Sequence, residues 1–250
     1  MFNALIGDCF GAWGERQPCQ SLPARPLPPS DDSYLTLATA RALLTDPTAE
    51  GFARCYQKAY HDHPKAGFGA GFAAWAQKGE LTPNPSWGNG CVMRVSPLAA
   101  WARTLEEALT LADASCALSH AHADAKLATR LVAGTGWLWR RRGPEAARAW
   151  AQSFWPLPWP ALPTGPIAFD ARAVSTAPLA LGAAFASPTV AATLELVLSW
   201  GGDCDTLAAT ACGLWPELDA ELFEAVAPHF SSAEHDLMAR FERACTKRLP

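Results

Sequence analysis

Hydrophobic residues recur at helical spacing along most of the chain, and no stretch alternates long enough to predict a sheet. The clearest apolar stripe consists of Phe2, Leu5, Ile6, Cys9, Phe10 and Trp13. Further helices are predicted at about 34–44, 91–103, 104–120, 125–142, 144–154, 171–186, 189–200, shortly after 206, 217–227 and 232–246. The pattern predicts an all-α fold in a single domain over residues 1–250.

A second stripe on the first helix consists of Gly7, Gly11 and Gly14, at spacings of four and three. Each glycine in a helix costs about 1 kcal/mol relative to alanine. Three on one face therefore predict that another backbone or a ligand approaches closely. Asp8 and Glu15 are seven residues apart and share a helix face.

Proline-rich segments at 16–29 and 156–166, and Gly-rich segments at 62–71 and 80–90, are predicted loops. Apolar helices continue on both sides of the proline segments without a polar linker, so we interpret these segments as connections inside one domain. The run Leu194–Leu198 would also suit a short strand, but its neighbours continue the helical period.

Composition limits the classes of partner. Half of the residues are hydrophobic and the formal net charge is −4. A folded protein is indicated, without the bulk positive charge that grips nucleic acid or anionic lipid. The basic run Arg140–Arg142 is interpreted as a solvated helix face.

The same sequence bears on the compartment. The longest uncharged window, 173–194, contains two prolines and is a poor membrane span. The N-terminus has no basic region and carries Asp8, so we expect no signal peptide. The eight cysteines form no CxxC pair, which predicts reduced thiols in a cytoplasmic protein.

Two acidic clusters, Ser30-Asp31-Asp32 and Asp203-Cys204-Asp205-Thr206, each precede a helix. Either one alone is explained as a helix cap. Together they carry four carboxylates, and two unit charges about 5 Å apart repel by about 3 kcal/mol at an effective dielectric constant near 20. If the clusters converge, two divalent cations would balance them. A ligand set made only of oxygen favours Mg²⁺ or Mn²⁺ over Zn²⁺.

These clusters belong to five stretches by which the chain resembles the ADP-ribosylglycohydrolase family, which includes the dinitrogenase-reductase-activating glycohydrolases. In family order the stretches are IGDCFGAWGE (6–15), SDDSYLTLATARALL (30–44), SWGNGCVMRVSPLA (86–99), ALSHAHADA (117–125) and SWGGDCDTLAA (199–209). The resemblance implies a compact, orthogonal all-helical domain with a two-metal site between loops.

The resemblance also implies roles for individual residues. The implied metal ligands are Ser30, Asp31, Asp32, Asp203, Asp205 and Thr206. The implied catalytic residues are Glu15, Asp31, Asp32 and Asp205. The implied substrate-binding residues are Gly88, Asn89, Gly90, Met93, Arg94, Ser119, His120 and Gly202.

The implied activity is Mg²⁺-dependent cleavage of the glycosidic bond between ADP-ribose and a modified protein, nucleic acid or small molecule, with ADP-ribose as product. Such a bond breaks through an oxocarbenium-like state. We expect a monomer with no membrane partner. One alternative is a relative that binds ADP-ribose without cleaving it. Another is a phosphohydrolase using Asp203-Cys204-Asp205-Thr206, but the haloacid-dehalogenase motif has one more residue before its Thr or Val and follows a strand near the start of its domain.

The chain departs from the family pattern at several positions. Ser30 and Ser33 stand where threonine is usual, and Cys204 replaces a serine or threonine between two aspartates. Trp215-Pro216 stands where many members have a glycine-rich helix. The short segment between Glu15 and Ser30 argues against a long lid over the metals. These changes leave the acceptor of ADP-ribose open.

Overall fold

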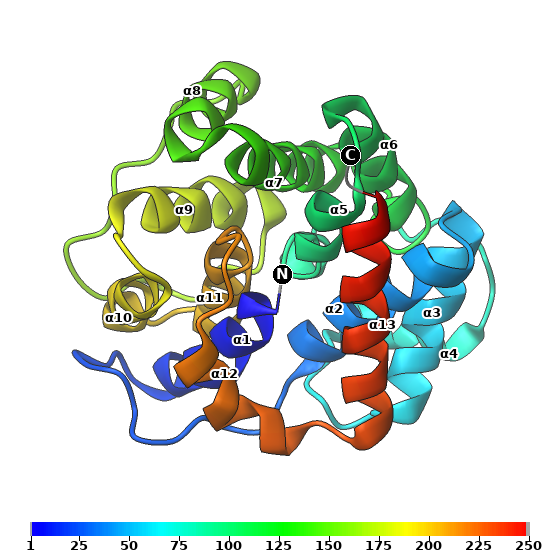
Figure 1. Cartoon of the computed structure of the whole chain (residues 1–250), viewed down its shortest axis with the longest axis horizontal. Coiled ribbons are helices and arrows are strands. Elements are labelled where there is room, and N and C mark those ends of the chain that lie inside the picture. Colours follow the sequence, from blue (N-terminus) through cyan, green and yellow to red (C-terminus); the bar gives the residue numbers. More distant parts are fainter. Residues whose placement is uncertain (1, 249–250) are drawn as a thin grey trace.

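The computed structural model describes residues 2–248, apart from the side chain of Arg16, and this part of the chain is helical without a strand (Figure 1). The α-helices are α1 (Asn3–Arg16), α2 (Asp31–Thr45), α3 (Ala49–Asp62), α4 (Ala70–Lys78), α5 (Ser96–Trp101), α6 (Leu105–Cys116), α7 (Ala123–Arg142), α8 (Pro144–Phe154), α9 (Ala173–Ala186), α10 (Val190–Trp200), α11 (Cys204–Cys212), α12 (Ala220–Val226) and α13 (Ser232–Arg248). Two 3₁₀ helices are η1 (Asn89–Cys91) and η2 (Ala227–His229). The predicted all-α class is confirmed.

Helices α1 and α11 lie against each other in the middle of the molecule (Figure 1). Helices α7, α8 and α9 pack on one side. Helix α3 packs on α2 on another side, and α4 lies against α3. Helix α13 lies across α2. One hydrophobic cluster extends from Phe2 to Phe241 and includes residues of helices on both sides.

The glycine stripe of α1 faces α11. A Cβ atom on Gly7 would lie 2.3 Å from the carbonyl oxygen of Ala208, and one on Gly11 would lie 2.8 Å from the Cα atom of Asp205. A Cβ atom on Gly14 would lie 2.3 Å from the Sγ atom of Cys204. The close approach predicted from the sequence is therefore made by the backbone of a second helix.

Local chemistry explains where many helices begin. The hydroxyl groups of Ser30, Thr48, Thr104 and Thr189 each accept a hydrogen bond from a backbone N–H in the first turn of the helix that follows. Such caps satisfy N–H groups that have no partner inside the helix. The predicted N-terminus at Thr104 is confirmed by this cap.

Two predicted boundaries are wrong. The expected helix 91–103 is reduced to α5, because Pro97 lacks an N–H group and fits only in the first helical turn. The expected helix 104–120 ends at Cys116. Beyond it, the backbone N–H of Ala121 donates to Asn84, and Asn84 N–H donates to Leu118, so this segment pairs with the 80–90 loop.

Other differences come from packing. Helices α3 and α4 were not predicted, and the alternative strand at 194–198 lies inside helix α10. Arg140 is not on a solvated face, because its guanidinium group donates to the backbone oxygens of Gly213, Trp215 and Pro216. These carbonyls follow the end of α11, where a cation is favourable.

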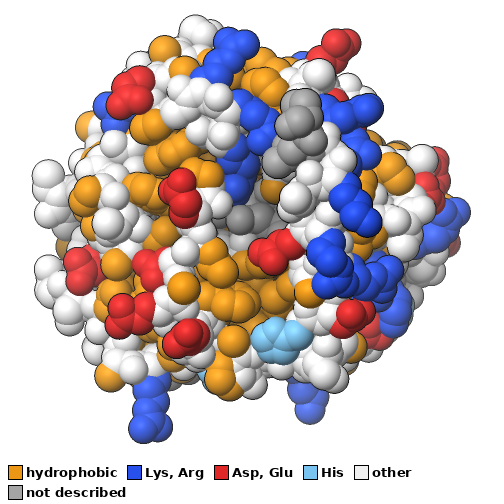
Figure 2. Space-filling model, in the orientation of Figure 1, with side chains coloured by type: hydrophobic (Ala, Val, Ile, Leu, Met, Phe, Trp, Pro, Cys, Tyr) orange, Lys and Arg blue, Asp and Glu red, His pale blue; other side chains and the backbone are white. Residues whose placement is uncertain are grey.

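Surface features agree with the modest net charge. On the face drawn in Figure 2, Lys and Arg side chains gather on the flank where α13 and α3 lie, and acidic side chains are scattered over the rest. Within residues 2–248, no helix is both long and apolar enough to cross a membrane. All eight cysteines are free thiols.

The contact between α1 and α11 predicts a large effect of one methyl group. We expect Gly7→Ala to lower the free energy of unfolding by about 1–3 kcal/mol, because its Cβ atom would overlap the backbone of Ala208. Helix propensity alone would produce a gain of about 1 kcal/mol. Urea denaturation measures the difference. The matched control is Gly165→Ala, which meets nothing within 4 Å and should change stability by less than about 0.5 kcal/mol. Equal stability of Gly7→Ala and wild type would contradict the packing.

Candidate functional site

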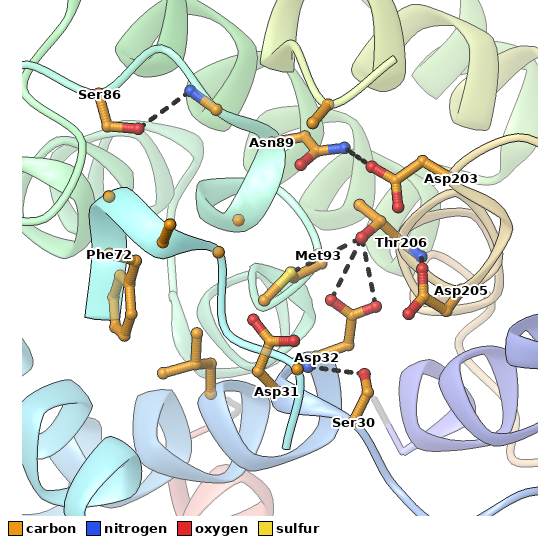
Figure 3. Close-up of a pocket in the computed structure, with 18 of the residues that line it drawn as sticks. Ser30, Asp31, Asp32, Phe72, Ser86, Asn89, Met93, Asp203, Asp205 and Thr206 are labelled. Carbon is orange, nitrogen blue, oxygen red and sulfur yellow. Dashed lines mark hydrogen bonds between the residues drawn. The ribbon is translucent and has the colours of Figure 1, made fainter. Parts of the chain in front are cut away.

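A pocket of about 370 Å³ lies where several helix ends meet. It is bounded by the end of α1, the start of α2, the loop before α4, the η1 turn and the start of α11. Figure 3 shows Asp31 and Asp32 on one side and Asp203, Asp205 and Thr206 on another, with their side chains directed toward the same space. The two acidic clusters therefore converge.

The first cluster is held at the N-terminus of α2. Ser30 is the N-cap, and its Oγ atom accepts a hydrogen bond of 3.2 Å from the backbone N–H of Asp32. The backbone N–H of Asp31 donates to the carbonyl oxygen of Ala66, in the loop between α3 and α4. Carboxylates in the first helical turn are stabilised by the positive end of the helix. The cap thus orients Asp31 and Asp32 toward the pocket.

The second cluster is held at the N-terminus of α11. Asp203 precedes the helix, and its Oδ2 atom accepts a hydrogen bond of 2.6 Å from the Nδ2 atom of Asn89. The backbone N–H of Thr206 donates to Asp205. The Thr206 hydroxyl donates to Asp32 at 3.3 Å, which joins residues 174 positions apart in the chain (Figure 3).

Burial and the mutual repulsion of carboxylates both act on the acids of this pocket. One carboxylate oxygen from each of Asp8, Asp32 and Asp205 lies within 4.8 Å of the others, and the same holds for Glu15, Asp203 and Asp205. Burial, followed by the neighbouring charges, raises the pKa of both Asp32 and Asp205 well above the ordinary value. Burial and the charge of Asp8 raise the pKa of Asp31 to about 7.

The charge of this cluster is not balanced by ion pairs. Among the described side chains, no Lys, Arg or His lies within 4.0 Å of any of these carboxylate oxygens. Carboxylate and hydroxyl oxygens are the donors that hard divalent cations prefer. The donor set therefore fits one or more divalent cations, which would replace the missing positive charge.

Asp8 was not predicted to belong to the site, although the sequence placed it on the face of Glu15. It is fully buried, and its carboxylate accepts hydrogen bonds from the backbone N–H groups and the hydroxyl groups of Ser30 and Ser33. With both oxygens so occupied, and without a place in the pocket lining, Asp8 anchors the start of α2. The Ser30 hydroxyl donates a hydrogen bond to Asp8, while Ser30 itself lines the pocket.

Most of the residues expected to bind substrate line the pocket, but three do not. The lining includes five of them, namely Gly88, Asn89, Gly90, Met93 and His120.

Arg94, Ser119 and Gly202 lie outside the lining. Arg94 and Ser119 are buried behind the wall, where the guanidinium group donates to the serine hydroxyl. Gly202 has a φ angle of +71°, and a Cβ atom there would lie 3.0 Å from the side chain of Ile167. Its contact is thus with the 155–172 loop.

The structure adds lining residues that the sequence did not indicate. They are Ala12, Leu35, Gly67, Gly69, Ala70, Gly71, Phe72, Ser86, Phe169 and Ala171. Phe169 is 67% exposed at the pocket. Its position in a proline-rich loop carries no periodic signal, so only the folded chain places it there.

The chain was compared with protein families and with solved structures, and each comparison found a similar protein or family. The model of a family described as ADP-ribosylglycohydrolase matches residues 1–215, which contain every residue of the pocket. A solved structure entitled "ADP-ribosylglycohydrolase-related protein complex" is similar to this chain, with a TM-score of 0.77 and 20% sequence identity. The similarity covers 98% of this chain and 95% of that chain. At 20% sequence identity, this similarity shows that the two proteins share a fold. The search of curated proteins gave no match.

The raised carboxyl pKa values predict how the metal-free protein responds to pH. Asp31 has a pKa of about 7 in the fold against an ordinary value of 3.8, so its protonated form favours the folded state. This stabilisation is complete below about pH 4 and is lost as the pH rises through about 7. In EDTA, we therefore expect the melting temperature to fall between pH 5 and pH 7.5. Melting curves followed by circular dichroism measure this change.

The variant Asp31→Asn should show a weaker fall in EDTA, because the amide does not ionise. The control Asp236→Asn changes a surface carboxylate, 63% exposed, and should retain the wild-type response. A wild-type melting temperature that rises over this pH range would contradict the electrostatic description.

Proposed function

The chain belongs to the ADP-ribosylglycohydrolase family, and from this premise we propose that it is a metal-dependent hydrolase that cleaves the glycosidic bond between ADP-ribose and a modified acceptor. The observation that carries the proposal is the pocket into which two distant acidic stretches converge without a balancing ion pair among the described side chains. The acceptor would be a protein side chain, a nucleic acid or a small molecule.

We assign two divalent cations, Mg²⁺ or Mn²⁺, to this pocket. The assigned ligands are Ser30, Asp31, Asp32, Asp203, Asp205 and Thr206. Asp205 is common to both groups of neighbouring carboxylates, so it would hold a cation together with Asp32 from α2 or with Asp203. When bound, the cations supply Lewis-acid stabilisation for ribose hydroxyls and for a nucleophilic water.

The other residues bind and orient the substrate. Glu15 lines the pocket at the end of α1 and is more exposed than the aspartates, so it is accessible to a water and to the leaving group. Burial raises the pKa of Glu15, although a hydrogen bond with Asp205 opposes the shift. A raised pKa suits a group that exchanges a proton near neutral pH. We assign Glu15 as the general acid/base.

The wall of the pocket formed by the η1 turn suits the diphosphate. Gly88 and Gly90 flank Asn89 in the η1 turn, and both glycines line the cavity. The absence of side chains lets a ligand approach the backbone closely. The carbonyl oxygen of Ala171 accepts the N–H of Asn89, and Ser86 Oγ accepts the N–H of Gly88, so the turn has a defined shape.

The proposal is tested with defined substrates that carry ADP-ribose on arginine, serine or a nucleic-acid base, each with Mg²⁺ and with EDTA. We expect the wild-type protein to release ADP-ribose from one class in Mg²⁺ only. Asp31→Asn and Asp205→Asn should lose this activity together with the thermal stabilisation by Mg²⁺, because both lose a charged ligand. Asp236→Asn is the control and should keep both. Wild-type rates in Asp31→Asn and Asp205→Asn would refute the site, and tight binding of ADP-ribose without any hydrolysis would indicate a binding protein.

Glu15→Gln separates chemistry from binding. The amide keeps the shape of the side chain but cannot exchange a proton, so kcat should fall by about 10²- to 10⁴-fold. We expect Mg²⁺ to raise the melting temperature as in the wild type. Steady-state kinetics and melting curves measure the two effects. A variant with normal kcat would remove Glu15 from the catalytic assignment.

A further inference from the structure

Arg94 is a buried cation directly behind the wall of the pocket. It is 1% exposed, and its guanidinium carbon lies 3.9 Å from the centroid of the Tyr56 ring. Its Nη2 atom donates to the Ser119 hydroxyl at 2.6 Å. The Nε and Nη1 atoms have no hydrogen-bond partner among the described residues. A buried charge is costly unless it is compensated, so the contacts that this guanidinium group does make are informative.

A role for Arg94 follows from the contacts of Nη2. The same atom lies 3.5 Å from the Nδ1 atom of His120, and Ser119 Oγ lies 3.2 Å from that Nδ1. Arginine donates hydrogen bonds and never accepts them. Since Ser119 Oγ already accepts from Arg94, its own hydrogen is available to the imidazole. Both neighbours therefore present hydrogens to Nδ1 of His120.

This arrangement selects one tautomer of the ring. If Nδ1 accepts, the proton of a neutral imidazole must lie on Nε2. A proton on Nδ1 would instead face the guanidinium hydrogens. Burial, together with the charge of Arg94, lowers the pKa of His120 well below the ordinary value, so the ring is neutral. The Nε2–H tautomer is thus the form that satisfies these contacts.

The Nε2 atom faces the glycine turn of the pocket. A Cβ atom on Gly90 would lie 3.2 Å from it, and one on Gly88 would lie 3.9 Å from it. Gly88, Gly90 and His120 all line the cavity. Within residues 2–248, no protein group accepts a hydrogen bond from Nε2. The donor is therefore available to an oxygen atom of a ligand.

We propose that Arg94 and Ser119 are positioning residues that hold His120 as a neutral Nε2–H donor toward an oxygen of the bound ADP-ribose. The ligand named here rests on the proposed function. Arg94 acts through Ser119 and His120, since it does not line the cavity. The aromatic rings of Tyr56 and Phe72, at 3.9 and 5.9 Å from the guanidinium carbon, keep the cation in place. The proposal gives His120 a hydrogen-bonding role and excludes it as the proton donor of the reaction.

The tautomer can be measured in the ligand-free protein. We expect ¹⁵N imidazole spectra at pH 7 to show His120 as a neutral ring protonated on Nε2, with the signal assigned by its loss in His120→Gln. Ser119→Ala should produce a mixture of tautomers, and Ser119→Thr, which keeps the hydroxyl group, should retain the wild-type signal. A ring protonated on Nδ1 in the wild type, or an unchanged tautomer in Ser119→Ala, would overturn the proposal.

A double-mutant cycle then measures the effect on ligand binding. Ser119→Ala should weaken ADP-ribose binding about tenfold in calorimetry, as expected for a misdirected hydrogen bond. His120→Ala removes the ring that Ser119 positions, so Ser119→Ala in that background should have no further effect. An equal loss in both backgrounds would show that Ser119 supports the fold alone, and would overturn the proposal.

These results separate the two proposals. A protein with the Nε2–H tautomer and tight binding of ADP-ribose, but no hydrolysis of any substrate, would contradict the proposed function and support the positioning role. A protein that hydrolyses its substrate while His120 carries its proton on Nδ1 would support the function and overturn the positioning role.

Discussion

The contact between the glycine face of α1 and the backbone of α11 is the constraint on which the rest of this structure depends. A Cβ atom on Gly7 or Gly11 would lie within 3 Å of α11. A residue larger than glycine therefore fits at these positions only if one of the helices moves. The contact places Glu15, at the end of α1, beside Asp205, at the start of α11. The loss of helix propensity at the glycines is thus offset by the close packing that assembles the pocket.

A second feature of the pocket is that it buries several carboxylates whose negative charges repel one another. The aspartates lie at the N-termini of α2 and α11, where the helix ends favour negative charge. This effect contributes about 0.3–1 kcal/mol for each carboxylate, less than the repulsion of two charges at these distances. Helix ends alone therefore do not balance the cluster. A divalent cation would supply the missing positive charge. Asp8 maintains the arrangement of the acids by accepting four hydrogen bonds from Ser30 and Ser33.

The C-terminal helix supports the site from outside the region matched by the family model, which ends at residue 215. Helix α13 packs across α2, and its Phe241 stacks on Trp101. Near its start, Glu234 lies 3.7 Å from His63, whose ring stacks on Tyr34 of α2. These contacts tie the loop beside Asp31 to the body of the protein. The walls of the pocket are thus held by a helix whose residues do not line it.

The sequence by itself determined the all-α class, most helix positions, the close approach at the glycine stripe and the two acidic clusters. Each of these depends on local spacing or on the chemistry of a few adjacent residues, which a linear pattern carries. Only the tertiary structure decided that Asp8 anchors α2, that Arg94 lies behind the pocket wall, and that Phe169 borders the cavity. Those outcomes depend on contacts between residues far apart in the chain. Packing between helices determines whether a side chain contacts another residue or borders the pocket.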